Sequence, residues 1–176
     1  MTTAESLFIL VTIIGFLVFI FLKKVNWKGL GFKPNSFLKG WWLIVLFNII
    51  IFCLVQFALI KKFISLPVWM LDKDPIIPLF AITFLQEILF RGVIINFFEK
   101  FGKRKALWIS ITIFVLFHLI APYTWNSVGL IFAGLTLVAG YFWGWHFLKY
   151  RNIYMLGVSH FLVNLSFNFV FFELLS

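Results

Sequence analysis

Three clusters of polar residues lie inside segments that are otherwise apolar enough to cross a membrane. They are Gln86-Glu87 with Arg91, then Phe114 with His118, then His160 with Asn164. An ionisable group in hydrocarbon is costly, so such groups seldom occur there without a partner or a task. A carboxylate, an amide and two imidazoles are groups that can activate water and stabilise an oxyanion. The clusters therefore point to a catalytic or binding site inside the bilayer.

The Glu and the Arg of the first cluster are spaced to pair with each other. Glu87 and Arg91 are four residues apart, which places them on one face of a helix. Taken alone, the pair has a purely structural interpretation, in which each charge offsets the cost of burying the other. Gln86 points about 100° away from Glu87 around the helix. It can therefore face a different space, such as a cavity.

The histidine clusters have structural interpretations as well. His118 can be a packing histidine, or it can meet the membrane interface near the end of its segment. His160 and Asn164 share a helix face, and hydrogen bonding between helices is a routine use of such side chains in membranes. Only the joint occurrence of all three clusters favours a functional site.

The composition is that of a membrane protein. The 176 residues are 63% hydrophobic and 22% aromatic, with only 12% charged, whereas about a quarter of a soluble domain is charged. We therefore expect an all-α, polytopic bundle in which residues 1–176 form one membrane domain. The net charge of +9 lies in the loops and does not indicate nucleic-acid binding. The single cysteine, Cys53, allows no internal disulfide and no cysteine-based metal site.

Six apolar segments are long enough for transmembrane helices, which need about 20 apolar residues. They cover residues 6–22, 40–60, 75–98, 106–121, 127–148 and 153–175. The first could be a signal peptide. However, no Lys or Arg precedes it, and Lys23-Lys24 follows it in place of a cleavage site. We expect it to be a retained helix.

The distribution of Lys and Arg sets the orientation. The first, third and fifth loops together hold 11 of these residues, and the second loop holds three. The odd loops are therefore predicted to be cytoplasmic, with both termini outside. By helical rise, the carboxylate, imidazole and amide groups of the clusters lie about 10–18 Å from the cytoplasmic edge of a slab about 30 Å thick. This similar depth favours convergence on one mid-membrane cavity.

Three smaller patterns concern packing. Gly140 and Gly144 form a small-xxx-small step, which predicts a close contact between helices. Residues 61–73 mix apolar residues with Lys and Pro, so this segment can lie along the outer interface. His146 lies beside Trp145 near the end of its segment, and we interpret it as a residue of the membrane interface.

The three clusters resemble the motifs of the CPBP family, which includes type II CAAX prenyl endopeptidases and the bacteriocin-processing and self-immunity (Abi) proteins. The family pattern is Glu-Glu-x-x-x-Arg, then Phe-x-x-x-His, then His-x-x-x-Asn or Asp. The chain has Gln86-Glu87-x-x-x-Arg91, Phe114-x-x-x-His118 and His160-x-x-x-Asn164. Each motif alone is weak, but all three in this order inside apolar segments argue strongly for homology. The CPBP-like region is residues 75–176, and the first two segments match only in being apolar.

The resemblance implies a role for each motif residue. In the family, the first Glu and the first His activate water, and the second His and the Asn form an oxyanion hole. Carried over, His118 would orient or deprotonate water, while His160 and Asn164 would bind the oxyanion. Glu87 and Arg91 would be the pair that holds the motif helix together. The implied reaction is hydrolysis of a peptide bond within or beside the membrane, without a covalent intermediate.

The chain departs from the family pattern at its first position, where Gln86 replaces a Glu. An amide cannot take a proton from water and can only position it. Glu87 could then act as the base, or Gln86 could belong to a variant in which His118 activates water. The chain could instead have lost catalysis. An introduced Glu→Gln substitution would give the same sequence.

The leading hypothesis is an intramembrane endopeptidase of a prokaryotic plasma membrane. Its partner would be a membrane-anchored substrate such as a prenylated CAAX-type protein, a bacteriocin precursor or another lipidated peptide. The alternative is a non-catalytic membrane scaffold, regulator or immunity protein, and a small transporter fits less well. Glu87, His118 and His160 could also supply three zinc ligands. The resemblance favours a metal-free, glutamate-type mechanism, so we expect neither a metal nor another cofactor.

Overall fold

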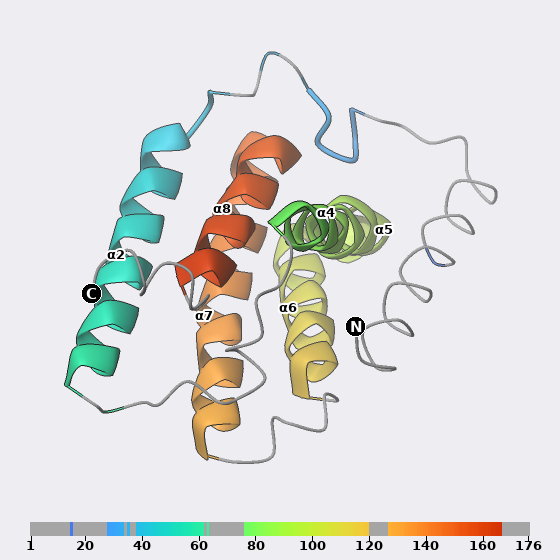
Figure 1. Cartoon of the computed structure of the whole chain (residues 1–176). Helices are drawn as coiled ribbons and strands as arrows, with labels where there is room; N and C mark the ends of the chain where they lie inside the picture. The colour runs from blue at the N-terminus through green and yellow to red at the C-terminus, as the bar shows by residue number, and fades with distance from the viewer. Residues whose placement is uncertain are drawn as a thin grey trace.

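The computed structural model describes residues 28–33, 38–61, 76–119 and 127–166, with isolated positions 15, 35 and 63 and with backbone alone at 127–132. In these residues every regular element is a helix (Figure 1). The predicted all-α class is therefore confirmed for the described part of the chain. The first expected span, 6–22, lies outside it apart from Gly15, as does the proposed interfacial segment 61–73 apart from Lys61 and Phe63.

Five helices follow one another along the described chain. The first is α2 (Trp41–Ile60), and the last three are α6 (Lys103–Leu119), α7 (Ser127–Tyr150) and α8 (Ile153–Ser166). The second is one continuous helix, Ile76–Phe101. It is composed of α4 (Ile76–Glu87), the π-helix η2 (Ile88–Ile95), α5 (Asn96–Phe98) and the 3-10 turn η3 (Glu99–Phe101). Each of the five helices begins within three residues of an expected span. By length and composition, two of the described helices can cross a membrane, namely α2 and the continuous helix Ile76–Phe101. Membrane crossing by all six expected segments stays a prediction.

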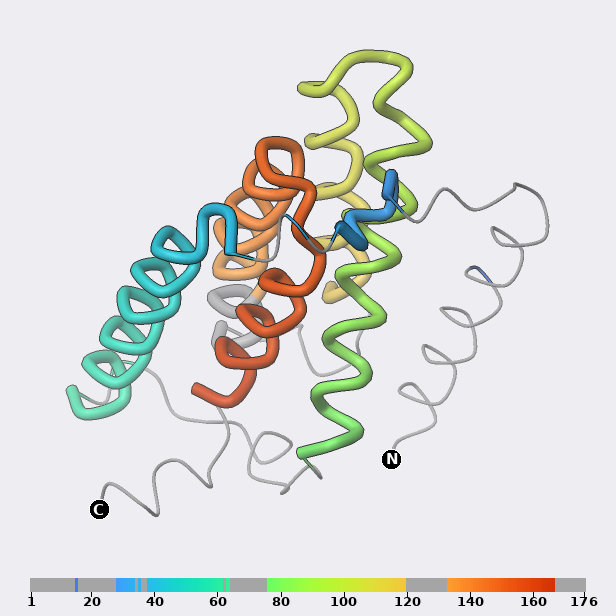
Figure 2. Tube along the Cα trace, turned by 90° about the horizontal axis from the view of Figure 1, so that it is seen from above, coloured from blue at the N-terminus to red at the C-terminus, as the bar shows by residue number. Residues whose placement is uncertain are grey.

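Helix α8 lies between α2 and α4, and α7 packs along α6 (Figures 1 and 2). The core between them is built from large side chains, among which Phe90, Phe114, Trp143 and Leu156 are almost completely buried. Because these four residues come from four different helices, the core joins η2, α6, α7 and α8. The motif residues lie on η2, α6 and α8 and on α4, which continues into η2, so the core also positions the site.

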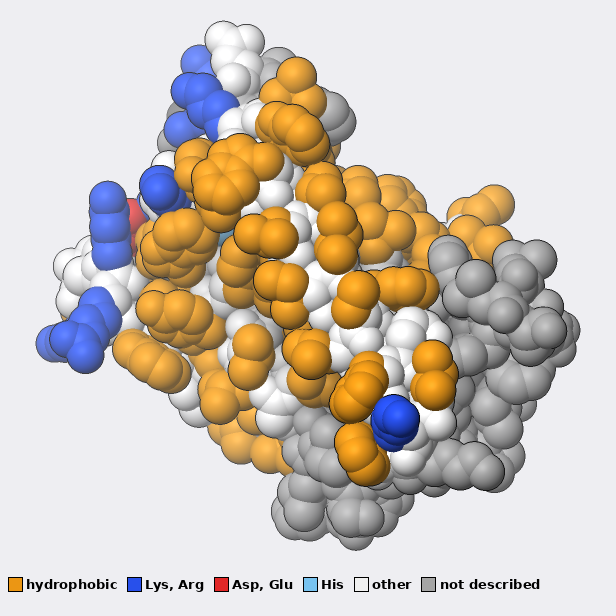
Figure 3. All heavy atoms as spheres, turned by 90° about the vertical axis from the view of Figure 1, so that its left-hand side faces the viewer, with side chains coloured by type: hydrophobic (Ala, Val, Ile, Leu, Met, Phe, Trp, Pro, Cys, Tyr) orange, Lys and Arg blue, Asp and Glu red, His pale blue; other side chains and the backbone are white. Residues whose placement is uncertain are grey.

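The outer face of α2 is apolar along its whole length. Its exposed large side chains are Trp41, Trp42, Val45, Leu46, Ile49, Ile50, Leu54, Phe57 and Ile60. Hydrophobic side chains dominate the corresponding face of the molecule, and Lys and Arg gather mainly at its margin (Figure 3). A helix that is apolar all round and exposed on one side is suited to a lipid environment.

The close approach of α6 and α7 depends on glycine. A Cβ at Gly144 would lie 2.4 Å from Cδ1 of Leu107, and a Cβ at Gly140 would lie 3.1 Å from Cδ1 of Phe114. Both neighbours belong to α6. The close helix contact predicted from the small-xxx-small step is therefore confirmed, and α6 is the partner helix.

Residues 28–33 pack across the end of the bundle at which α7 turns into α8. Leu30 is buried, and its carbonyl oxygen would lie 3.2 Å from a Cβ at Gly92 of η2. The carbonyl of Gly29 accepts a hydrogen bond from Nδ2 of Asn96 at 2.7 Å. Oδ1 of Asn96 accepts a hydrogen bond from Nη1 of Arg151 at 2.8 Å. Asn96 thereby links the N-terminal segment to the connection between α7 and α8.

The structure corrects the interpretation of His146 as an interface residue. Its side chain is fully buried, its ring packs against Tyr150, and Nε2 lies 3.3 Å from the carbonyl oxygen of Gly40. Gly40 precedes α2 with a φ of 72°, and a Cβ there would collide with both rings. The beginning of α2 therefore rests directly on the end of α7.

Candidate active site

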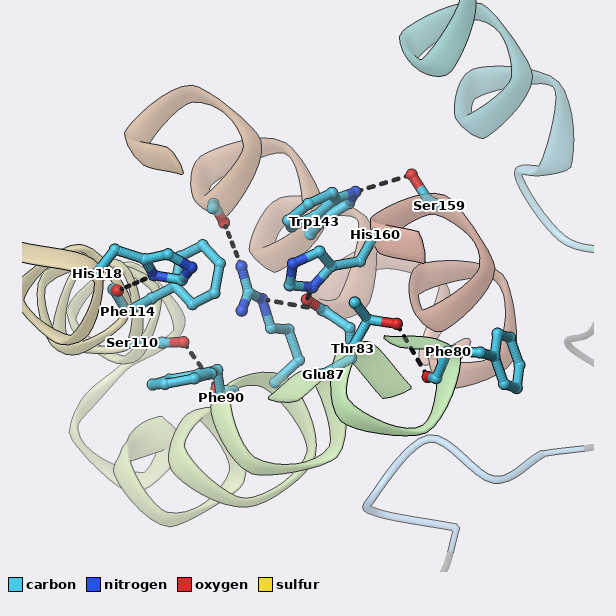
Figure 4. Close-up of polar contacts among 12 residues, drawn as sticks. Phe80, Thr83, Glu87, Phe90, Ser110, Phe114, His118, Trp143, Ser159 and His160 are labelled. Carbon is cyan, nitrogen blue, oxygen red and sulfur yellow. Dashed lines mark hydrogen bonds and ion pairs between the residues drawn. The ribbon is translucent and has the colours of Figure 1, made fainter. Parts of the chain in front are cut away.

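Glu87 is the centre of the polar cluster and is completely inaccessible to solvent. Its Oε1 lies 2.8 Å from Nδ1 of His160 on α8, and its Oε2 lies 3.2 Å from Nε of Arg91 on η2 (Figure 4). The ion pair expected from the spacing of Glu87 and Arg91 is therefore present. The contact with His160 joins residues 73 positions apart and brings the first and third motifs together.

The buried guanidinium of Arg91 is surrounded by the carboxylate and by aromatic rings. Its Cζ lies 4.3 Å from the ring centroid of Phe114 and 5.5 Å from that of Trp143. Its Nη2 lies 3.5 Å from the carbonyl oxygen of Gly140. A weakly hydrated planar cation stacks well on aromatic faces, so these rings offset part of the loss of water around the charge. Nη1 has no hydrogen-bond partner among the described residues.

His160 lies between Glu87 and the indole ring of Trp143. The two ring centroids are 4.4 Å apart with an interplanar angle of 27°, so the imidazole is stacked on the indole. The carboxylate of Glu87, which is paired with Arg91, can only accept, so Nδ1–H of His160 donates to its Oε1. This assigns the proton at Nδ1 and directs the Nε2 edge of the ring away from Glu87.

His118 is fixed by the helix on which it lies. Its Nδ1 is 2.8 Å from the carbonyl oxygen of Phe114, one turn earlier on α6. A carbonyl oxygen can only accept, so Nδ1 carries the proton and Nε2 is the basic nitrogen of the neutral ring. The ring of Phe114 packs against both imidazoles, with centroid distances of 4.5 Å to His118 and 5.8 Å to His160. Phe114 is thus the spacer that the two histidines share (Figure 4).

The two amide residues of the motifs have fewer contacts. Gln86 is only 8% exposed, and its Oε1 has no hydrogen-bond partner in the described part of the chain. A buried amide oxygen without a partner is costly, which favours a bound water or a substrate N–H at this position. Asn164 is half-buried one turn after His160. No described hydrogen bond joins Gln86 or Asn164 to the Glu87 cluster, so their roles stay predictions.

The zinc alternative finds no support in the geometry. Within the described ranges, no three His, Cys, Asp or Glu side chains lie close enough together to hold a metal ion. Glu87 and His160 are in direct contact, but His118 lies on the other side of Phe114 from His160 and does not complete a ligand set with them (Figure 4).

Sequence reasoning missed the π-helix that carries Arg91. The backbone changes from α-helix to π-helix directly after Glu87 and changes back at Asn96. Such widened turns are frequent at functional sites. The hydroxyl of Ser110 on α6 donates a hydrogen bond to the carbonyl of Phe90 at 2.7 Å, which helps to satisfy the altered backbone. A buried serine facing an apolar helix was the available signal, but it does not distinguish a π-helix from an α-helix.

Sequence reasoning also missed three residues that support His160. Trp143 on α7 is almost completely buried and stacks on the imidazole. Its Nε1 donates a hydrogen bond to Oγ of Ser159, which also accepts one from Nδ2 of Asn48. The position of Ser159 directly before a motif histidine was the signal that could have indicated it.

Comparison with known proteins agrees with the motif resemblance. The sequence model of the family described as Type II CAAX prenyl endopeptidase Rce1-like matches residues 73–166. This region covers more than half of the 176 residues and contains every motif residue from Gln86 to Asn164. Neither the curated proteins nor the solved structures gave a match. The chain therefore belongs to the type II CAAX prenyl endopeptidase Rce1-like family, a family of membrane-embedded proteases.

Proposed function

We propose that the protein is an intramembrane endopeptidase that uses water to hydrolyse a peptide bond in a membrane-anchored substrate. The observation that carries the proposal is the contact of one buried carboxylate, Glu87, with both Arg91 and His160. Glu87 thereby positions the imidazole of His160 in an apolar environment, where a hydrogen bond to a developing charge is worth more than in water.

His118 is the group best placed to activate water. Its Nδ1–H is held by the carbonyl of Phe114, so Nε2 can accept a proton from water while hydroxide attacks the peptide carbonyl carbon. The unpartnered Oε1 of Gln86 can accept a hydrogen bond from the same water and position it. This division of roles allows Gln86 to replace a carboxylate without removing the base.

The negative charge on the former carbonyl oxygen requires donors. The amide N–H of Asn164 is proposed to donate to this oxygen. Nε2 of His160, whose Nδ1–H is held by Glu87, is proposed to join it as a donor when the ring takes up a second proton. The tetrahedral intermediate then collapses and the C–N bond breaks. The proton held by His118 passes to the leaving amine, so water is divided between a new carboxyl group and a new amino group.

Glu87 is a poor candidate for the base. One of its carboxylate oxygens contacts His160, the other contacts Arg91, and the side chain is inaccessible. Taking a proton from water would require the carboxylate to leave a buried ion pair, which is strongly unfavourable. Of the alternatives open for Gln86, these contacts favour activation of water by His118 over activation by Glu87.

The proposed substrate is a lipidated or otherwise membrane-anchored peptide. The family points to a CAAX-type prenylated C-terminus, and the apolar surface of the chain suits a substrate that approaches within the bilayer. A bacteriocin-like precursor is a second candidate substrate that is also anchored to the membrane. A direct test uses matched farnesylated and unmodified peptides with the protein in lipid nanodiscs.

The deciding experiment is mass spectrometry of protein and peptide termini in membranes. Cells that express the wild-type chain are compared with cells that express His118→Ala or His160→Ala at the same level. His146→Gln is the matched control, because His146 is a buried histidine that lies outside the motif cluster. We expect new termini with the wild-type chain and the control, and none with the two motif variants.

Termini that are identical in all four samples would contradict hydrolysis. The non-catalytic interpretation, which Gln86 favours, would then take its place. Cross-linking in the membrane would be the next measurement, because a scaffold or immunity protein must hold a partner. New termini that persist in His118→Ala would instead contradict the assignment of the base while leaving a protease.

A further inference from the structure

We propose that Asn48, Ser159 and Trp143 form a positioning network that sets the ring plane of His160. Its consequence for turnover rests on the proposed hydrolysis. Asn48 lies on α2, outside the region of residues 73–166 that matches the family. The network therefore gives the N-terminal part of the chain a role in the site.

Ser159 is the junction of the network. Its Oγ accepts a hydrogen bond from Nδ2 of Asn48 at 2.8 Å and another from Nε1 of Trp143 at 2.9 Å. A hydroxyl oxygen has two lone pairs, so both of its acceptor positions are occupied. Ser159 is completely buried and Trp143 is 1% exposed, so water cannot replace either bond.

The network reaches the reacting group through the indole ring. Trp143 stacks on His160, and Glu87 holds Nδ1 of the same imidazole. Stacking restricts rotation of the imidazole out of its plane, and the hydrogen bond restricts rotation within it. Together the two contacts define the direction in which Nε2 of His160 points.

Helix α2 fixes the outer end of the network. Nδ2 of Asn48 also donates to the carbonyl of Ile44 at 2.8 Å, so the orientation of the amide is set by its own helix. Phe47 packs edge-on against Trp143, with ring centroids 6.1 Å apart. Two neighbouring residues of α2 therefore restrain the indole, one through Ser159 and one by direct contact.

The test separates positioning from general stability. Trp143→Phe retains an aromatic ring over His160 but removes the N–H that binds Ser159, and Ser159→Ala removes the acceptor. We expect each change to lower kcat about tenfold, with KM changed by less than about twofold. The double variant should be no slower than the slower of the two single variants, because both changes remove the bond between Trp143 and Ser159. Asn48→Leu, of similar size, should have a smaller effect of the same kind.

The matched control is Ser166→Ala. Ser166 is also a buried serine of α8, but its described hydrogen bond lies within its own helix and runs to the carbonyl of Val163. We expect its kcat to be unchanged. Equal losses in Ser166→Ala and Ser159→Ala, or an unchanged kcat in Trp143→Phe, would overturn the proposal.

A spectroscopic measurement makes the network testable without turnover. In nanodiscs with ¹⁵N-labelled histidine, the resonances of His160 should shift in Trp143→Phe and Ser159→Ala but stay in place in Ser166→Ala. If the wild-type chain hydrolyses nothing, the proposed function fails and these shifts still decide the network. If hydrolysis is found and the His160 resonances are the same in all variants, the network fails and the function stands.

Discussion

At the scale of single residues, one carboxylate organises the site. Glu87 contacts a guanidinium and an imidazole that come from different helices, and all three groups are buried. A buried charge without a partner is far less stable than a buried pair, so the contacts must be retained together. The residue beside it, Gln86, is buried without a hydrogen bond to its amide oxygen in the described structure.

Arg91→Ala should lower the stability of the protein in detergent. It leaves the carboxylate of Glu87 buried without its guanidinium and opens a space beside Phe114, so we expect a loss of about 3–5 kcal/mol. A thermal melt measures the change as a lowered Tm. Arg91→Lys keeps the charge but loses the planar stacking, so its Tm should lie between those of the wild type and Arg91→Ala. The exposed Lys105→Ala is the control, and an unchanged Tm in Arg91→Ala would contradict the importance of the pair.

Gln86→Glu should increase hydrolysis. A carboxylate at this buried position can share the proton of the attacking water with His118, and general-base groups typically contribute about 10²–10⁴-fold. We expect at least a tenfold rise in kcat, measured with a membrane-anchored peptide. The control is Gln56→Glu, which makes the same change at a partly buried amide of α2 and should give no gain in hydrolysis. An equal rate in the wild type and Gln86→Glu would show that His118 suffices as the base.

At the scale of elements, the site depends on how closely α6 and α7 approach. The carbonyl of Phe114 on α6 binds Nδ1 of His118, one turn later on the same helix. The ring of Phe114 packs against His160 and against the guanidinium of Arg91. Gly140 of α7 faces this ring so closely that a methyl group there would press on it. The spacing of two helices is thereby transmitted to both imidazoles.

Gly140→Ala should reduce hydrolysis several-fold. The added Cβ would lie 3.1 Å from the ring of Phe114 and 3.6 Å from Nη2 of Arg91, so the ring must move by a few tenths of an ångström. A small displacement of a catalytic imidazole is enough to slow turnover. Gly134→Ala on the same helix meets nothing within 4 Å and is the matched control. Rates that fall equally in both variants would point to helix propensity rather than to the contact.

At the scale of the whole molecule, residues 28–33 hold one end of the bundle together. Gly31 adopts a φ of +93°, and its carbonyl accepts a hydrogen bond from the N–H of Ile153 at 3.3 Å, at the beginning of α8. Arg151, between α7 and α8, forms an ion pair with Glu99 and a hydrogen bond to Asn96. The segment before α2 therefore fixes the relative positions of the helices that carry the motifs.

Gly31→Ala should destabilise the protein more than Gly102→Ala. Both glycines have a positive φ, so both substitutions strain the backbone. A Cβ at Gly31 would lie 2.7 Å from the ring of Phe147, whereas a Cβ at Gly102 meets nothing within 4 Å. The difference in Tm between the two variants therefore measures the close packing of the segment. Equal values of Tm would contradict its role in holding the bundle.

The sequence alone determined the helices, the family and the contacts within a single helix. Apolar runs between charged loops predict helices because backbone polar groups in lipid must be satisfied internally, and the five described helices begin near the predicted positions. The pairing of Glu87 with Arg91 follows from a spacing of four residues. A close helix contact at Gly140 and Gly144 also follows from their lack of side chains, whereas the identity of the partner helix does not.

Only the tertiary structure decided which helix faces meet. These helices are apolar on nearly all sides, so hydrophobicity does not distinguish a lipid-facing side from a buried one. The contact of Glu87 with His160, the stacking of Trp143 on that ring and the burial of His146 could not be predicted for this reason. They depend on the rotation of each helix about its axis, which is set by close packing and by hydrogen bonds between residues far apart in the chain.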